Sequence, residues 1–181
     1  MVASAAMLIR ERGARSTAIA DVLAHSGAPR GSAYHHFPGG RGELLCEAVD
    51  YAADFVAEAL AAAGNAMDML DMTVAYYRQG LLDSDYRAGC PVMAVAVEAG
   101  DPDTRTAAAV HRAAVAFERW NDLIAARLVT EGVSRDTASD LATLVIAALE
   151  GALVLARAQR DVAPLDATHR RLRSLLKTEG N

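Results

Sequence analysis

The sequence predicts an all-α protein, and three observations support this fold class. The 181 residues are 52% apolar but only 5% aromatic, and alanine and leucine dominate. Such a composition favours close-packed helices over a β-sandwich. No window shows the sustained alternation of apolar and polar residues that a half-buried strand requires. We expect about nine helices, divided into an N-terminal three-helix domain over residues 1–46 and a larger helical domain over residues 47–181.

The first expected helix covers residues 2–12. Ala6, Leu8 and Ile9 would face inward, and Gly13 stops the helix. Glycine is suited to this place because it tolerates the backbone conformations that close a helix.

Residues 17–45, TAIADVLAHSGAPRGSAYHHFPGGRGELL, have the outline of a helix-turn-helix. Thr17 is a suitable N-cap for the first helix of the pair, since its hydroxyl can accept an unpaired backbone N–H. Ile19, Val22 and Leu23 then form one apolar face at i, i+3 and i+4. Ser26-Gly27 ends this helix.

The second helix of the pair has room only for residues 29–37. Pro29 suits its first turn, where a missing N–H has no cost. The helix presents side chains that donate hydrogen bonds to phosphates and base edges, namely Arg30, Ser32, Tyr34, His35 and His36.

Turn signals separate the remaining elements. They are Pro38-Gly39-Gly40, Gly64-Asn65, Gly100-Asp101-Pro102, Gly132 and Ala163-Pro164. The expected helices between them cover residues 41–63, 67–82, 91–99, 104–130, 134–160 and 165–177.

The last two helices are both amphipathic and are joined by a short turn. Such a pair of helices can form one half of an intermolecular four-helix bundle, although the apolar stripes of both helices could also pack inside one protomer. The side chains we expect at a dimer interface are Leu144, Ala148, Gly151, Ala152, Leu155, Leu165, His169 and Leu172.

Charge is distributed unevenly along the chain. The net charge is −5, yet residues 1–46 hold five arginines against three acidic residues, and the remainder is acidic. This asymmetry is typical of a DNA-binding domain that is fused to a sensor domain. The two cysteines, Cys46 and Cys90, form no CxxC pattern. We expect reduced thiols, no signal peptide and a cytoplasmic location.

The helix-turn-helix residues resemble the tetracycline-repressor (TetR) family of bacterial transcription regulators. GAPRGSAYHHFPGGRGEL here is similar to GAPRGSLYHHFPGGKEEL in the LmrA-like subgroup, and looser similarity covers residues 89–92 and 148–161. The resemblance implies a homodimer that binds a double-stranded DNA operator and carries a C-terminal domain for a small apolar effector.

The resemblance also implies which residues contact DNA. These are Thr17, Arg30, Gly31, Ser32, Tyr34, His35 and Arg41. Phe37 is instead expected to pack inside the small domain. Ala18 and Ala20 stand where look-alikes often have a polar or basic residue, and Ala33 replaces the usual leucine.

The effector site is expected in the C-terminal domain, where methionines and a lone tryptophan suit flat apolar ligands. The candidate lining residues are Met67, Met72, Tyr76, Met93, Val97, Phe117, Trp120 and Ile124. Each of these positions could equally belong to an ordinary core.

Three functions compete at this point. A ligand-responsive repressor released from a palindromic operator is favoured. An enzyme is not, since the sequence has no nucleophile elbow, phosphate loop or HExxH motif, and no catalytic residue or cofactor is expected. His35 and His36 are adjacent on a helix and point about 100° apart, so a metal site is not expected either. The alternative is a helical dimeric sensor or adaptor that no longer binds DNA, which Ala18, Ala20 and the low basic content favour.

Overall fold

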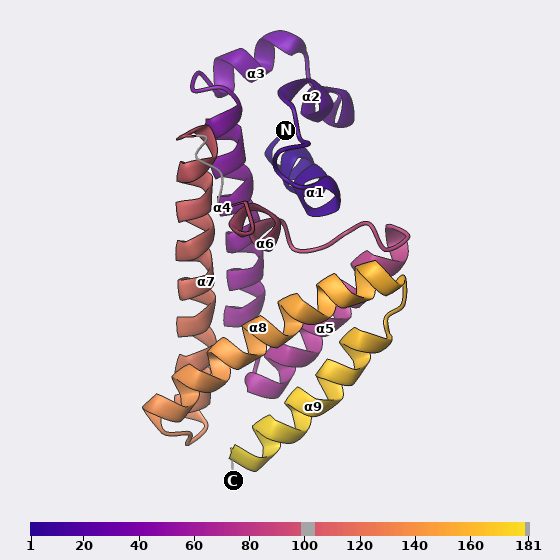
Figure 1. Cartoon of the computed structure of the whole chain (residues 1–181). Helices are drawn as coiled ribbons and strands as arrows, with labels where there is room; N and C mark the ends of the chain where they lie inside the picture. Colours follow the sequence, from indigo (N-terminus) through magenta and orange to yellow (C-terminus); the bar gives the residue numbers. More distant parts are fainter. Residues whose placement is uncertain (99–103, 180–181) are drawn as a thin grey trace. The chain divides into compact units, whose positions relative to one another are not determined.

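The computed structural model describes residues 1–98 and 104–179, and these ranges contain nine α-helices and no strand (Figure 1). The predicted all-α class is therefore confirmed. The helices are α1 (Val2–Arg12), α2 (Ile19–Ser26), α3 (Arg30–His36), α4 (Arg41–Ala62), α5 (Ala66–Asp83), α6 (Pro91–Ala96), α7 (Thr104–Thr130), α8 (Arg135–Gln159) and α9 (Ala163–Glu179). The break expected at residues 100–102 lies outside the described residues.

The chain forms two compact units. Unit 1 comprises Met1–Phe55 and Cys90–Ala116, and unit 2 comprises Val56–Gly89 and Phe117–Asn181. The long helices α4 and α7 each begin in unit 1 and end in unit 2. These compact units differ from the division after residue 46, which concerns function and stays a prediction.

Unit 1 contains the helix-turn-helix. Helix α1 packs against α2 and α6, and Ala5 and Ile9 of α1 are fully buried (Figure 1). Gly13 ends α1 with φ +86°, a conformation that a side chain would strain. Within this unit α4 and α7 are linked by an ion pair, with Arg112 Nη1 2.5 Å from Asp50 Oδ2.

The turn between α2 and α3 follows from its residues. Gly27 adopts φ +68°, and the Ser26 hydroxyl oxygen accepts a hydrogen bond from the Ala28 backbone N–H at 3.3 Å. Pro29 is the N-cap of α3, and its carbonyl accepts the Ser32 N–H at 2.9 Å. Helix α3 is thus one residue shorter at each end than the predicted range 29–37, with Pro29 and Phe37 as its caps.

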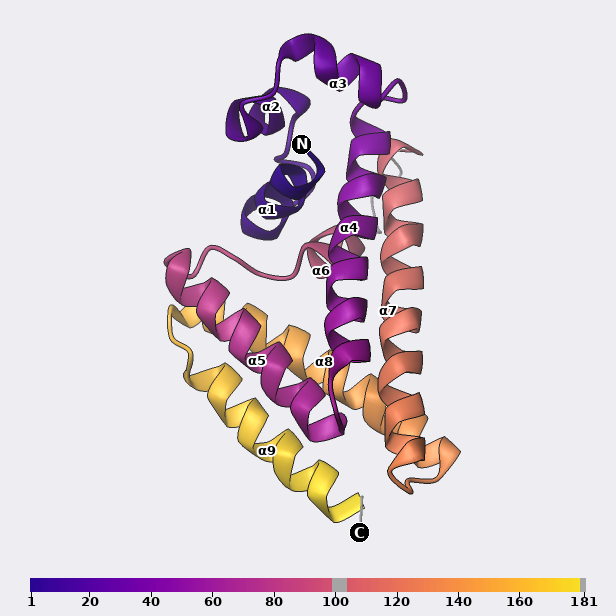
Figure 2. The same cartoon turned by 180° about the vertical axis from the view of Figure 1, so that it is seen from behind.

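Unit 2 is built on three helices that lie side by side in both views, α5, α8 and α9 (Figure 2). The Asn65 side chain caps α5 by accepting the Asp68 N–H at 2.8 Å. Ser134 caps α8 by accepting the Thr137 N–H at 3.3 Å. Leu165 of α9 is fully buried.

A carboxylate joins α5 to α9. Asp71 accepts hydrogen bonds from His169 Nε2, 2.7 Å from its Oδ1, and from the Arg173 guanidinium. Burial raises the pKa of Asp71, but the hydrogen bonds and charges of Arg173 and His169 outweigh it and hold this pKa below its usual value.

We expect Asp71→Asn to flatten the acid dependence of stability. An aspartate whose folded-state pKa is lowered stabilises the fold fully above the unfolded pKa of about 3.9, and this stabilisation is lost as the pH falls through the lowered pKa. Urea unfolding at a series of pH values should show a shallower loss of free energy below about pH 4 in Asp71→Asn. Asp140→Asn, at an exposed position on α8, is the control. Equal acid slopes for wild type and Asp71→Asn would contradict this role.

One described helix, α8, is long and apolar enough to span a membrane by length and composition alone. Its most apolar stretch is 44% buried inside the protein. The buried side packs against α5 and α9, as the core helix of a globular domain does. The other side of α8 carries apolar side chains, including Leu144, Val154 and Leu155, that no described part of the chain covers.

Candidate nucleic-acid interface and apolar cavity

Several side chains that can form hydrogen bonds lie on the exposed face of α3. Ala33 and Phe37 are buried and hold the helix on the unit, as expected for Phe37. The remaining positions point outward: Arg30, Gly31, Tyr34, His35 and His36 are exposed and Ser32 is half-buried. Tyr34 is 75% exposed, so an apolar ring with a polar tip stands in solvent.

The side chains on this face are of the kinds that bind double-stranded DNA. Guanidinium and phenol groups donate to phosphate oxygens, and imidazole and guanidinium groups reach base edges. The His35 and His36 rings lie 5.1 Å apart at an angle of 77°, edge to face. Within residues 1–98 and 104–179, no group of three or more His, Cys, Asp or Glu side chains could hold a metal ion.

The position of Thr17 contradicts the expectation that its hydroxyl caps α2 and contacts DNA. Its side chain is only 2% exposed, and its hydroxyl donates to the Gly13 carbonyl at 2.9 Å. The N-cap of α2 is Ala18, whose backbone N–H donates to Asp21 Oδ2 at 3.2 Å. The Thr17 hydroxyl therefore stabilises the link between α1 and α2 and is removed from the DNA-contact set.

Arg41 is also placed differently from the expectation. It begins α4, as predicted, but its Nε donates to the Thr17 carbonyl at 2.9 Å and its Nη2 donates to the Ala14 carbonyl. The guanidinium thus ties the start of α4 to the segment between α1 and α2. We assign the Arg41 side chain to the structure of unit 1 and not to a phosphate.

We expect Arg41→Ala to destabilise unit 1 by about 1.5–3 kcal/mol, the range for hydrogen bonds that involve a charged group. Denaturant unfolding followed by circular dichroism measures this loss. Unchanged stability together with lost DNA binding would return Arg41 to the interface.

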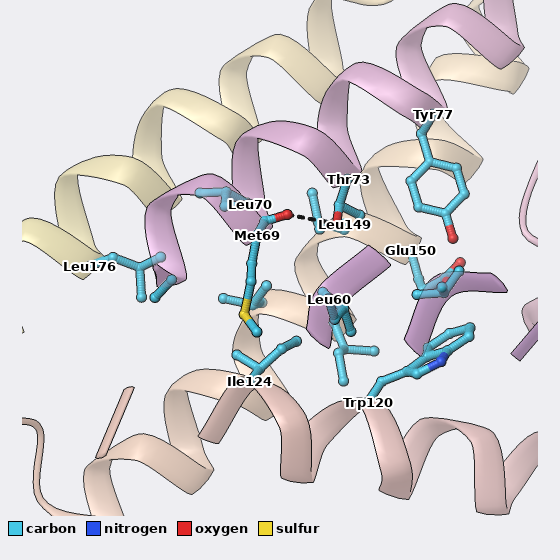
Figure 3. A pocket seen from close by; sticks show the side chains of 14 residues that line it. Leu60, Met69, Leu70, Thr73, Tyr77, Trp120, Ile124, Leu149, Glu150 and Leu176 are labelled. Carbon is cyan, nitrogen blue, oxygen red and sulfur yellow. Dashed lines mark hydrogen bonds between the residues drawn. The ribbon is translucent and has the colours of Figure 1, made fainter. Parts of the chain in front are cut away.

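Unit 2 contains an apolar cavity (Figure 3). About 560 Å³ of space between its side chains is not filled by atoms, including the part open to solvent. The lining residues come from α4, α5, α7, α8 and α9: Val56, Leu60, Ala66, Met69, Leu70, Thr73, Tyr77, Trp120, Ile124, Val145, Ile146, Leu149, Glu150 and Leu176.

Two of the eight expected lining residues, Trp120 and Ile124, line this cavity. Phe117 supports the Trp120 ring edge-on, with centroids 5.4 Å apart, but is not a lining residue. Met72 and Tyr76 are exposed and do not line the cavity, and Met67 is half-buried outside it. Met93 and Val97 belong to unit 1 and do not line it.

Tyr77 and Glu150 line the cavity but were not predicted from the sequence. Thr73 and Tyr77 are spaced i, i+4 and belong to one stripe along α5. Met72 and Tyr76 belong to a neighbouring stripe, and the two stripes overlap. Glu150 is 7% exposed and is the one charged residue between Leu141 and Ala156. A lone acid in such an apolar run is the signal that could have found it, because a buried acid must be compensated by its surroundings.

The uncovered side of α8 carries part of the expected dimer interface. Leu144 and Leu155 are 47% and 52% exposed, Gly151 is exposed, and Ala148 is half-buried. Three other expected members, Leu165, Leu172 and Ala152, are buried in the core of the unit. A side chain buried in its own protomer cannot also cover a second copy, so these three are removed from the interface. His169 is half-buried and bonded to Asp71, and its place at the interface stays a prediction.

Two family models match the chain. Residues 2–48 match the model of bacterial regulatory proteins of the tetR family. Residues 66–171 match the C-terminal domain of LmrA/YxaF-like transcriptional regulators. The first covers the helix-turn-helix, and the second covers the helices that line the cavity.

Individual proteins agree with these models. An uncharacterized HTH-type transcriptional regulator of Mycobacterium tuberculosis is 57% identical over 181 residues, covering 99% of this chain and 93% of that protein. The HTH-type transcriptional regulator LmrA of Bacillus subtilis is 27% identical over 171 residues, covering 91% and 88%.

The crystal structure of a TetR transcriptional regulator from Legionella pneumophila has the same fold, with a TM-score of 0.79 at 20% identity over 96% of this chain and 94% of that one. The exposed donor face of α3, the two family models and the relatives agree on one class, which is not enzymatic. The chain belongs to the TetR family of DNA-binding, helix-turn-helix transcription regulators, and its C-terminal domain is of the LmrA/YxaF-like type.

Proposed function

We propose that this regulator is a homodimeric repressor that leaves a palindromic operator when a small, largely apolar molecule enters the cavity of unit 2. The observation that carries the DNA half of the proposal is the exposed face of α3, where Arg30, Tyr34 and His35 face solvent while Ala33 and Phe37 anchor the helix. We propose that Arg30, Ser32 and Tyr34 hold the phosphate backbone and that His35 reaches base edges, with the Gly31 backbone close to the DNA.

Dimerisation through the exposed side of α8 would provide the second helix-turn-helix that a palindromic operator requires. Leu144, Ala147, Gly151, Val154 and Leu155 recur at i+3 and i+4 spacing on this side. The small residues at its centre let a second helix approach closely, and the leucines at its ends have apolar surface to bury. Two copies of α3 about 34–36 Å apart would read adjacent half-sites of a palindrome.

Release requires a ligand that prefers one of two conformations. Val56 and Leu60 of α4 line the cavity, and the same helix begins at Arg41, directly after the helix-turn-helix. A ligand that favours a conformation with the wrong spacing of the two α3 helices lowers operator affinity by its differential affinity for that conformation. Such a regulator acts on genomic DNA, so the cytoplasm is its proposed location.

Selection of bound fragments from random DNA at low salt tests this proposal. An inverted repeat with half-sites about one helical turn apart is the expected result. No enrichment, with the dimer intact, would support the alternative of a helical sensor or adaptor that does not bind DNA. The protein with the selected operator then serves as the assay for release by ligands.

A further inference from the structure

Three residues of unit 2 have a left-handed backbone although none of them is glycine. Asp85 and Tyr86 follow the end of α5 with φ +53° and +60°, and Arg160 follows the end of α8 with φ +54°. Within residues 1–98 and 104–179, every other residue with a positive φ is a glycine. This conformation costs free energy for a residue with a side chain, and the cost is greater for bulky Tyr86 than for Asp85.

The same three residues bind one another. Arg160 Nη2 donates to Asp85 Oδ1 at 2.6 Å, and its Nη1 donates to the Asp85 carbonyl at 3.3 Å. The Arg160 Cζ lies 5.8 Å from the centre of the Tyr86 ring, a cation–π contact. The ends of α5 and α8 accordingly lie side by side in both views (Figures 1 and 2). We call these three residues the Arg160 latch.

The contacts of the latch are exposed to solvent. The side chains of Arg160 and Asp85 are 58% and 69% exposed, and an exposed ion pair adds little to the stability of a whole fold. The hydrogen bond and the charge of Arg160 nevertheless hold the pKa of Asp85 below its usual value. Backbone strain that persists because neighbouring side chains maintain it is typical of switch regions. The latch is therefore suited to hold a local conformation that can open.

The chain runs directly from the latch to α6. Only residues 87–89 lie between Tyr86 and Cys90, the N-cap of α6. The Tyr86 N–H donates to the Leu81 carbonyl at 2.7 Å, which anchors the turn to the end of α5. Helix α6 belongs to unit 1, where it packs against α1. The φ angles of Asp85 and Tyr86 therefore set the direction in which the chain leaves α5 for α6.

We infer that Arg160 is a positioning residue for operator binding, because it holds Asp85 and Tyr86 in the left-handed conformation and so holds α6 in the conformation that binds DNA. When the contacts of Arg160 open, Asp85 and Tyr86 relax to the negative φ that their side chains prefer, and the chain that leads to α6 changes direction. This inference rests on the proposed function and adds a point at which operator binding is regulated.

Hydrogen–deuterium exchange of the full-length protein tests the latch without DNA. In Arg160→Ala, the backbone amides of residues 85–89 should exchange at least about tenfold faster than in the wild type, while amides in the middle of α5 and α8 exchange as before. Arg135→Ala is the control, because Arg135 is an exposed arginine at the opposite end of α8. Equal exchange of residues 85–89 in the wild type and Arg160→Ala would overturn the latch.

Operator titration without any ligand tests the regulatory role. The affinity of Arg160→Ala should fall by about tenfold, the loss expected if about a tenth of the molecules keep the binding conformation. Adding Tyr86→Gly to Arg160→Ala should restore most of the affinity, since glycine adopts a φ near +60° without the latch. A destabilised fold would not be rescued in this way, because glycine at position 86 adds no contact.

The outcomes separate this inference from the proposed function. Faster exchange in Arg160→Ala with unchanged operator affinity makes the turn a structural element alone and overturns the inference. A loss of affinity that Tyr86→Gly does not restore overturns it too, because the loss then does not come from the backbone conformation. A wild-type protein that binds no operator contradicts the proposed function and the regulatory role together, while the exchange measurement still decides whether Arg160 holds the turn.

Discussion

Replacing Arg30 or Tyr34 with alanine is expected to abolish operator binding while the dimer stays intact. Each side chain stands on the exposed face of α3 and contributes nothing to the buried core of unit 1. A hydrogen bond to a charged phosphate is worth about 1.5–3 kcal/mol, and a homodimer loses it in both half-sites, so the combined loss is about 3–6 kcal/mol. Operator affinity should therefore fall by about 100-fold or more.

Gel-shift or fluorescence-anisotropy titrations at one fixed salt concentration measure this loss. Arg135→Ala is the matched control, because Arg135 is an exposed arginine at the start of α8 in unit 2. If Arg30→Ala and Tyr34→Ala both bind the operator like the wild type, the face of α3 does not hold the DNA.

Leu155→Glu is expected to separate the dimer and, as a consequence, to weaken operator binding. Leu155 is 52% exposed within the protomer and lies on the uncovered side of α8. In the proposed dimer this substitution buries two carboxylates without partners, each at a cost of several kcal/mol. The dissociation constant of the dimer should rise by more than about a hundredfold.

Sedimentation velocity at micromolar protein concentration distinguishes monomer from dimer. Leu82→Glu is the control, since Leu82 is a leucine of similar exposure (43%) on α5 in the same unit. A Leu155→Glu protein that sediments as the wild type does would place the dimer interface, if there is one, on another surface.

The helix boundaries were predictable because local chemistry determines them. Gly13 and Gly27 adopt positive φ at the ends of α1 and α2, where the sequence placed stops. Ser134, a good N-cap residue, caps α8. The outward face of α3 followed from the same reasoning, because Ala33 and Phe37 are spaced i, i+4 and are its two apolar anchors.

The roles of Thr17 and Arg41 could not be read from the sequence. Arg41 binds carbonyl groups 24 and 27 residues earlier in the chain, and this contact exists only once α1, α2 and α4 have packed. A backbone carbonyl has no sequence signature, so an arginine near a helix-turn-helix is as consistent with phosphate binding as with a structural clamp.

The cavity was only partly predictable for a related reason. Helix α5 has two overlapping apolar stripes, and packing against α8 and α9 buries the stripe with Met69 and Tyr77 and exposes the one with Met72 and Tyr76. Between Leu144 and Leu155, helix α8 is apolar on both its buried and its exposed side, so spacing alone could not assign its residues to the core or to a second copy.

The DNA sequences selected by the wild type and by His35→Ala test most directly whether α3 reads the operator. His35 is exposed on α3, and its removal leaves the buried anchors of the helix unchanged. We predict that the wild type selects an inverted repeat and that His35→Ala loses the base preference at one matching position in each half-site. The same consensus for both proteins, at every position, would contradict it.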